Sequence, residues 1–178
     1  MVTPAVDGAT SYNGFVFVRK DSPYHTLEDL KGARFGFVHK KSASGYACPK
    51  AAMLEAGKDP DKFFGTVRYM GSHEAVIEAV QKGELDAGAT YTFFLVPGSE
   101  EQMRIIFETG SIPKESLVAG AHIKPELVKA MTKALQQVTP DDPVAGPGMR
   151  HERYSEMLPI NDEAYDVVRK ANKVIVES

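Results

Sequence analysis

The chain has 178 residues, of which 43 % are hydrophobic and 25 % charged, enough for one globular domain and part of a second. Its net charge of −3 lacks the basic excess typical of nucleic-acid-binding proteins, so no nucleic-acid partner is expected. The single cysteine, Cys48, excludes an internal disulfide, and no apolar run approaches the ~20 residues that a membrane-spanning helix needs.

Short apolar runs and helical patterns alternate along the chain. Strands are expected at residues 15–18, 33–38, 66–70, 85–90 and 103–107, with a further strand at 117–123. A single helical turn is expected at 26–32, and helices at 44–56, at 72–83, from Pro125 onward and from Asp162 to about Val176. Residues 139–149 hold three prolines and two glycines, which predicts a loop. This alternation predicts an α/β fold with a mostly parallel sheet and helices on both of its faces.

The loop after the strand at 33–38 is the best candidate for an anion site. It reads His-Lys-Lys-Ser-Ala-Ser-Gly-Tyr from position 39 and leads into a helical pattern. Backbone N–H groups at a helix start have no intrahelical partner, and the helix dipole places partial positive charge there. Ser42, Ser44 and Gly45 would let an oxyanion approach that backbone and add donors of their own. Lys40 and Lys41 are expected to be solvated and to attract anions at long range.

A second helix start, Gly71-Ser72-His73-Glu74, places a histidine in its first turn. Two such helix starts on one α/β chain suggest a protein that holds a small phosphate-like anion, with His73 donating a hydrogen bond to it. On its own, however, His73 also fits an ordinary exposed position at a helix start.

The other candidates have structural interpretations too. Ser42 and Ser44 fit turn and N-cap positions that need no ligand. Tyr91 fits either core packing after a strand or a wall of the site. Asp86, at a strand start, is expected to tie down the backbone rather than to contact a ligand, and Cys48 is expected to be a buried, inert thiol.

Several short motifs occur in an order that resembles one family. They are Leu27-Glu28-Asp29-Leu30-Lys31-Gly32, Ser42-Ala43-Ser44-Gly45, Gly71-Ser72-His73-Glu74-Ala75-Val76, Gly83-Glu84-Leu85-Asp86-Ala87-Gly88, Ile112-Pro113 and Leu158-Pro159-Ile160-Asn161-Asp162. In this order and spacing the chain, from about Tyr12 onward, resembles the phosphate/phosphonate-binding periplasmic proteins of ABC transporters, the PhnD-like family.

The resemblance implies a type II periplasmic-binding-protein fold with no catalytic residues, no cofactor and no metal. It implies a small phosphorus oxyanion (phosphate, phosphite or a small phosphonate) as ligand and the membrane permease of an ABC transporter as partner. The implied location is periplasmic or membrane-anchored and extracytoplasmic, with a signal segment that this chain does not contain. The ligand-binding residues that it implies are Ser42, Ala43, Ser44, Gly45, His73, Tyr91 and Glu115. Ala43 stands where the family motif typically has threonine, which removes one side-chain donor.

The resemblance also bears on ligand choice. Members that hold an aminoalkyl phosphonate place carboxylates opposite its ammonium group, one of them shortly after the Asp-Ala-Gly strand. Here that neighbourhood, Thr90-Tyr91-Thr92-Phe93-Phe94, contains no acid, whereas the second family acid is kept as Glu115. A ligand with a small or apolar substituent is therefore expected, because an unpaired ammonium is costly to bury against aromatic rings.

Full family members have two lobes that clamp the ligand, so the resemblance divides the chain as well. Residues 1–14 would be a crossover segment, 15–118 a complete ligand-binding lobe, and 119–178 the return crossover and C-terminal helices of the other lobe, whose first part is absent. The apolar stripes of those helices would then lack their sheet. Disorder, mutual packing or a homodimer of the chain is expected to deal with the exposed stripes, and ligand affinity is expected to be weak.

Two further classes of function remain open beside transport. One is a ligand-sensing domain of a signalling protein, which would use the same site as an input. The other, less favoured, is an enzyme on the same fold, for which the sequence offers no paired nucleophile and base.

Overall fold

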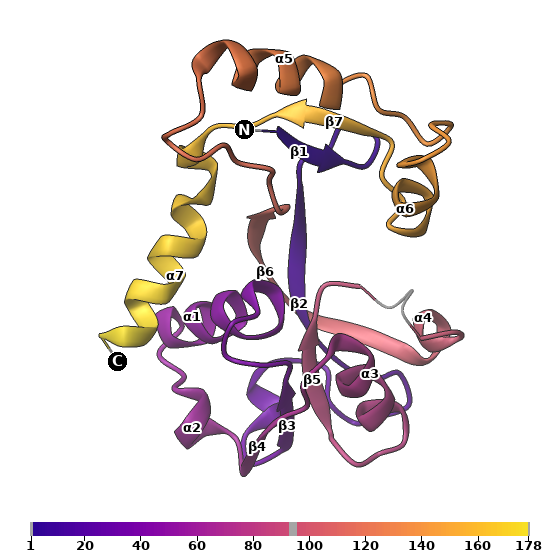
Figure 1. The fold of residues 1–178 in the computed structure, drawn as a ribbon. Coiled ribbons are helices and arrows are strands. Elements are labelled where there is room, and N and C mark those ends of the chain that lie inside the picture. Colours follow the sequence, from indigo (N-terminus) through magenta and orange to yellow (C-terminus); the bar gives the residue numbers. More distant parts are fainter. Residues whose placement is uncertain (1, 93–95, 178) are drawn as a thin grey trace. The chain divides into compact units, whose positions relative to one another are not determined.

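The computed structural model describes residues 2–92 and 96–177, which form two compact units (Figure 1). Unit 1 comprises Met1–Tyr12 and Pro113–Asp166, and unit 2 comprises Asn13–Ile112 and Val167–Ser178. Each unit is therefore assembled from segments that are far apart in the sequence.

Unit 2 is built on a five-stranded sheet in the order β4-β3-β5-β2-β6. The strands are β2 (Ser11–Arg19), β3 (Arg34–Phe37), β4 (Thr66–Tyr69), β5 (Ala87–Thr90) and β6 (Met103–Pro113). β3 runs parallel to β4 and to β5, whereas β2 runs antiparallel to β5. The expected α/β fold is confirmed, with a mixed sheet whose parallel trio β4-β3-β5 ends at a single edge.

Helices cover both faces of this sheet, because its central strands are apolar on both sides. Phe15 and Phe17 pack with the buried stripe of α3 (His73–Gln81), which consists of Val76, Ile77, Ala79 and Val80. The alternate residues Val16 and Val18 face a second cluster that includes Met53 of α1 (Cys48–Glu55). Fully burying each of these side chains contributes about 1.5–3 kcal/mol. Two short helices, α2 (Pro60–Phe63) and α4 (Ser99–Gln102), and a 3₁₀ turn at Glu28–Leu30 complete the connections.

The first helix after β3 begins differently from the expected α-helix at 44–56. It opens with a π turn, Ala43–Ala47, in which the Ala47 N–H donates to the Ser42 carbonyl at 2.9 Å, and it continues as α1. Pro49 has no N–H to donate to the Gly45 carbonyl, and that carbonyl instead accepts from the Val38 N–H at 3.0 Å. The wider turn is thus coupled to a bond with the end of β3, and π turns of this kind are frequent at functional sites.

Unit 1 contains a two-stranded antiparallel sheet of β1 (Val2–Ala5) and β7 (Glu156–Pro159), with α5 (Pro125–Leu135), α6 (Gly146–His151) and a 3₁₀ turn at Asp162–Tyr165. Two sequence predictions are wrong here. The strand expected at 117–123 is reduced to a single bridge between Val2 and Leu117, since the residues after it are exposed and have no strand to pair with.

The loop expected at 139–149 contains the start of α6. The Asp142 carboxylate accepts from the backbone N–H groups of Val144 and Ala145, both at 2.8 Å, and so holds the chain in a turn just before this helix. Pro147 occupies the first turn of α6, where its missing N–H costs nothing. The hydrogen bonds of the Asp142 side chain thus allow a helix to begin here, despite the high proline and glycine content of the segment.

The last helix, α7 (Asp166–Val176), belongs to unit 2 for nearly all of its length. Ala171 is buried, Ile175 packs against the core cluster that contains Phe35, and Lys170 forms a 2.9 Å ion pair with Glu55. The sequence analysis grouped this helix with residues 119–178, whereas the structure packs it on the sheet of unit 2. Its apolar side is therefore partly covered within this chain, with Val168 and Val174 half-buried and Val176 exposed.

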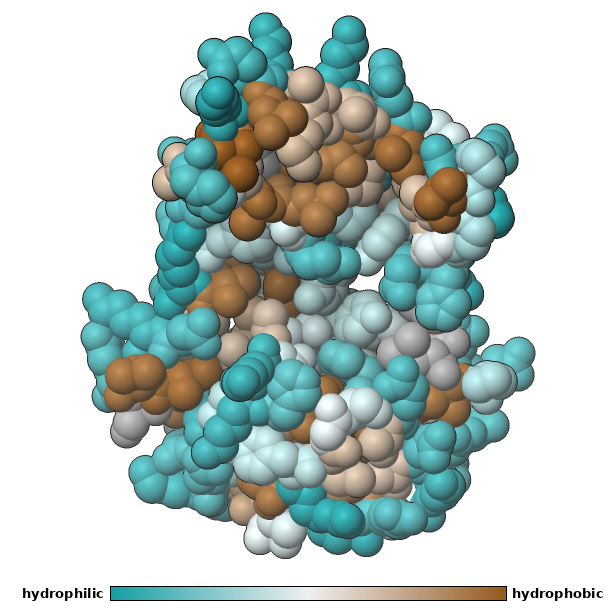
Figure 2. All heavy atoms as spheres, viewed as in Figure 1, coloured by the Kyte–Doolittle hydropathy of each residue, from teal (hydrophilic) through white to brown (hydrophobic). Residues whose placement is uncertain are grey.

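Helix α5 is different, because none of its residues is buried. Leu127 and Met131 are 51 % and 53 % exposed, and Figure 2 shows apolar side chains gathered on this part of the surface of unit 1. No helix in the described ranges is long and apolar enough to cross a membrane.

Candidate anion-binding site

Three loops meet at the edge where the parallel strands β3, β4 and β5 end. The Gly71 N–H donates to the Val38 carbonyl at 2.9 Å, which joins the loop after β4 to the loop after β3. His73 Nδ1 lies 2.9 Å from Thr90 Oγ1, which joins the start of α3 to the end of β5. The carboxyl edge of parallel strands is where open α/β sheets bind their ligands. The structure thus brings residues 42–45, His73 and Tyr91 to one edge of unit 2.

The turn at Ser42–Gly45 presents unused donors at this edge. Ser42 caps the turn, since its Oγ accepts from the Gly45 N–H at 3.0 Å. Within the described part of the chain, the backbone N–H groups of Ala43 and Ser44 and the Ser44 hydroxyl have no acceptor. Ser44 is only 3 % exposed, whereas Ala43 is half-buried. Such a turn, at the positive end of a helix, is suited to bind an oxyanion.

The position of this turn depends on Gly45. A Cβ placed on Gly45 would overlap the side chain of Val38 and lie 3.0 Å from Ser42 Oγ. Only glycine therefore allows the turn to lie this close to the end of β3.

The second helix start orients His73. Gly71 has a φ of 90°, and Ser72 then caps α3 by accepting from the Ala75 N–H at 3.2 Å. Burial lowers the pKa of His73 to about 4, with His39 adding to this effect and Glu74 opposing it. The imidazole is thus neutral near pH 7. Its ring is nearly perpendicular to that of Tyr91, at 87°, with 4.8 Å between the centroids.

Sequence reasoning did not assign a role to Thr90 or Tyr69. Thr90 is fully buried, and its hydroxyl contacts both His73 and the Thr92 carbonyl. Tyr69, at the end of β4, is 44 % exposed, and the ammonium of Lys40 lies 5.7 Å from its ring centroid. A polar or aromatic residue at the last position of a parallel strand is the signal that could have identified them.

Glu115 belongs to unit 1, where it is exposed and its carboxylate accepts from the Tyr154 hydroxyl, while its carbonyl accepts from Thr3 Oγ1 at 2.9 Å. Phe93, expected to replace a family acid, lies outside the described residues.

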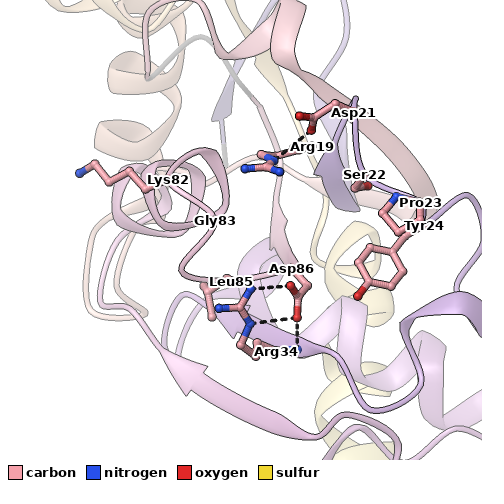
Figure 3. A pocket seen from close by; sticks show the side chains of 10 residues that line it. All are labelled: Arg19, Asp21, Ser22, Pro23, Tyr24, Arg34, Lys82, Gly83, Leu85 and Asp86. Atoms are coloured by element: carbon pink, nitrogen blue, oxygen red, sulfur yellow. Dashed lines mark hydrogen bonds and ion pairs between the residues drawn. The ribbon is translucent and has the colours of Figure 1, made fainter.

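A pocket of unit 2, with a volume of about 460 Å³, opens at the opposite edge of the sheet (Figure 3). Its charged side chains are already paired. Asp86 accepts from Arg34 Nη2 at 2.6 Å, from Nε at 3.1 Å and from the backbone N–H at 2.8 Å, and Arg19 Nε donates to Asp21 at 3.0 Å. The Arg34 guanidinium and backbone N–H lower the pKa of Asp86, although burial opposes them. Asp86 thus binds the backbone N–H of Arg34, as the sequence indicated. The charged side chains at this edge pair with one another.

The described residues include no cluster of three or more His, Cys, Asp or Glu side chains that could hold a metal ion. Cys48 is buried, and burial raises the pKa of its thiol, which disfavours the nucleophilic thiolate form.

Comparisons with known proteins identify the family and the fold. The family described as the periplasmic phosphonate substrate-binding protein of ABC transporters matches residues 1–165. A probable phosphite-binding protein of an ABC transporter from Prochlorococcus marinus, PhnD1, is 39 % identical over 64 residues, which are 35 % of this chain and 22 % of that protein. The chain thus aligns with less than a quarter of this curated relative.

Two solved structures share the fold. PhnD1 from Prochlorococcus marinus in complex with methylphosphonate has a TM-score of 0.81 at 17 % identity, covering 100 % of this chain and 72 % of that one. A binding protein component of an ABC phosphonate transporter from Pseudomonas aeruginosa has a TM-score of 0.79 at 21 % identity, covering 99 % and 63 %. The fold is accordingly that of the type II periplasmic binding proteins.

Proposed function

Since the chain belongs to the periplasmic substrate-binding proteins of phosphonate ABC transporters, we propose that it binds a small phosphorus oxyanion (phosphate, phosphite or a small phosphonate) and delivers it to a membrane permease. The family consists of transport proteins that are normally extracytoplasmic. We therefore place the whole protein in the periplasm or anchored on the outer side of the membrane, and we assign it no catalytic step.

One observation supports this proposal above the others. The Ala43 and Ser44 N–H groups and the Ser44 hydroxyl converge at a buried turn and have no acceptor within the described residues. An incoming oxyanion would give these three donors the acceptor that they lack, and a hydrogen bond to a charged group contributes about 1.5–3 kcal/mol. Hydrogen bonds to a charged oxygen are roughly twice as strong as those between neutral groups.

The remaining roles follow from position. Ser42 holds the turn through Gly45, and its hydroxyl hydrogen is left to donate to the ligand. His73 supplies a hydrogen bond from the start of α3, and the Tyr91 ring forms a wall beside it. Lys40 and Lys41 attract the anion without contacting it.

We further propose that the ligand carries a compact or methyl substituent. The relative of known structure that binds methylphosphonate has the same fold. The segment Thr90-Tyr91-Thr92-Phe93-Phe94 offers no carboxylate to an ammonium group. Glu115, which belongs to unit 1, stays a prediction of the family resemblance. We do not include a homodimer in the proposal, because the family likeness gives it no support.

Calorimetric titration of the chain with phosphate, phosphite, methylphosphonate and 2-aminoethylphosphonate tests the proposal, with sulfate as the comparison anion. We expect the three compact phosphorus anions to bind and methylphosphonate to be preferred to 2-aminoethylphosphonate. The absence of binding by all four phosphorus compounds would contradict the function, whereas a preference for 2-aminoethylphosphonate would contradict the assigned selectivity.

A further inference from the structure

The hydroxyl of Thr90 connects two groups at the site. Its oxygen lies 2.9 Å from His73 Nδ1 and 3.3 Å from the carbonyl oxygen of Thr92. Thr90 itself is fully buried at the end of β5, so water does not compete for this hydroxyl.

The single hydroxyl hydrogen decides which nitrogen of His73 is protonated. A carbonyl oxygen can only accept, so the Thr90 hydroxyl donates its hydrogen to Thr92. The same hydroxyl must then accept from His73, which places the imidazole hydrogen on Nδ1. In a neutral imidazole only one nitrogen carries hydrogen, so Nε2 has a lone pair and accepts.

A fully deprotonated phosphonate has acceptors only. Its oxygen cannot form a hydrogen bond with an Nε2 lone pair unless one more proton is present. That proton can sit on the ligand as P–OH, which then donates to Nε2, or on Nε2 itself, which then donates as imidazolium. Both arrangements contain the same number of protons.

We propose that Thr90 is a positioning residue which, by fixing the hydrogen of His73 on Nδ1, makes capture of a phosphorus dianion take up one proton. The proton comes from solvent and ends between His73 Nε2 and a ligand oxygen. A ligand that is already a monoanion brings this proton itself. The inference rests on the proposed function and specifies the protonation state in which the site holds its ligand.

The surroundings of His73 keep its imidazole neutral, with no hydrogen on Nε2, until the ligand arrives. Glu74, next to it on α3, favours the charged form, whereas burial and His39, from the loop after β3, disfavour it. The Tyr91 ring, directly after β5, stands nearly perpendicular to the imidazole. Within the described residues these are the titratable groups that act on His73. A bound anion adds negative charge at Nε2 and offsets the burial.

The test is the dissociation constant of methylphosphonate, measured by calorimetry from about pH 6 to about pH 9. Above the second pKa of the phosphonate, we expect the dissociation constant to rise about tenfold per pH unit, because each binding event then requires a proton. Titrations in buffers of different ionisation enthalpy should show an uptake approaching one proton per ligand. A dissociation constant that stays flat or falls over this range would overturn the inference.

Three variants separate the roles. In Thr90→Val, which has the same shape, the imidazole hydrogen is free to move to Nε2 and donate to a dianion, so the rise with pH should disappear. His73→Gln supplies an N–H donor that does not titrate. Its dissociation constant for methylphosphonate should therefore also stay constant above the second pKa of the phosphonate. Thr66→Val makes the same change at the opposite edge of the sheet. In this variant the dissociation constant should rise with pH as it does in the wild type.

The outcomes distinguish this inference from the function on which it rests. If the dissociation constant of Thr90→Val still rises tenfold per pH unit, the role of Thr90 is overturned. Binding whose slope persists in His73→Gln overturns the role of His73, even if the Thr90 variant does not fold. Failure of methylphosphonate, phosphate and phosphite to bind at every pH would contradict the proposed function, and the inference with it.

Discussion

Ser44 and His73 contribute to the site in different ways. Ser44 is buried and offers an N–H and a hydroxyl that no described residue uses. His73 is already engaged through Nδ1, and only its second nitrogen is left for a ligand. Ser44 is therefore suited to any oxyanion, whereas the contribution of His73 depends on protonation.

Removing the Ser44 hydroxyl tests the first of these roles. A hydrogen bond to a charged group contributes about 1.5–3 kcal/mol, so Ser44→Ala should weaken methylphosphonate binding by about tenfold or more. Calorimetric titration measures the effect, and Thr66→Val, which removes a hydroxyl at the far edge of the sheet, is the matched control. Equal affinities in Ser44→Ala and the wild type would place the anion elsewhere.

The low pKa of His73 also predicts how stability depends on pH. A histidine whose pKa is about 4 in the folded chain and near 6.5 when unfolded binds its proton more readily in the unfolded state. Stability should therefore fall as the pH drops from about 6.5 to about 4, by about 2–3 kcal/mol in total.

Urea denaturation of the wild type and of His73→Gln at several pH values checks this expectation. Carboxylates titrate in both proteins below about pH 5, so the difference between the two curves isolates the histidine. If the free energy of unfolding changed with pH in the same way in both proteins, protonation of His73 would not destabilise the folded chain.

At the scale of elements, the site exists because a π turn and a helix start are attached to adjacent parallel strands. Gly45 allows the turn to lie against Val38, and the bond between the Val38 N–H and the Gly45 carbonyl fixes it there. The main chain at Ala43 and Ser44 is consequently held in place before any ligand binds.

Gly45→Ala should disturb this arrangement. Its Cβ would lie 2.7 Å from Val38 Cβ, and overpacking of this kind costs about 1–3 kcal/mol. We expect a lower melting temperature and weaker methylphosphonate binding, measured by calorimetry. Gly110→Ala is the matched control, because a Cβ there meets no atom within 4 Å. Equal melting temperatures for the two variants would show that the turn can shift without cost.

The sequence predicted most elements of unit 2 because their apolar runs are continuous, as at Phe15–Val18. It did not predict the π turn, which depends on Pro49 and on a tertiary bond to Val38. The role of Thr90 was equally out of reach, since its pairing with His73 follows from the place of β5 in the sheet. Helix α6 was missed because two backbone bonds to Asp142 outweigh the local composition.

At the scale of the whole molecule, the two units differ in how much apolar surface they bury. The core of unit 2 has helices on both faces of its sheet. In the described part of unit 1, the buried apolar residues are Val2, Pro4, Ala5 and Met149, and its sheet has two strands. Two-stranded sheets are marginally stable alone.

Hydrogen exchange should reveal this difference. We expect the amides of β1 and β7 to exchange faster than those of β3 and β5, because opening unit 1 exposes less apolar surface. Exchange measured by mass spectrometry or NMR compares the two sheets in one sample. Equal protection of both sheets would mean that the two units unfold as one.

The central claim is that a phosphorus oxyanion binds at the free N–H groups of the turn after β3. The most direct test is to follow the backbone amide resonances by NMR during addition of methylphosphonate, which also detects weak binding. The account predicts that the amide protons of Ala43 and Ser44 show the largest downfield shifts, with His73 shifting as well. It would be contradicted if these resonances stayed in place, or if the largest shifts appeared around Arg19 and Arg34 at the opposite edge of the sheet.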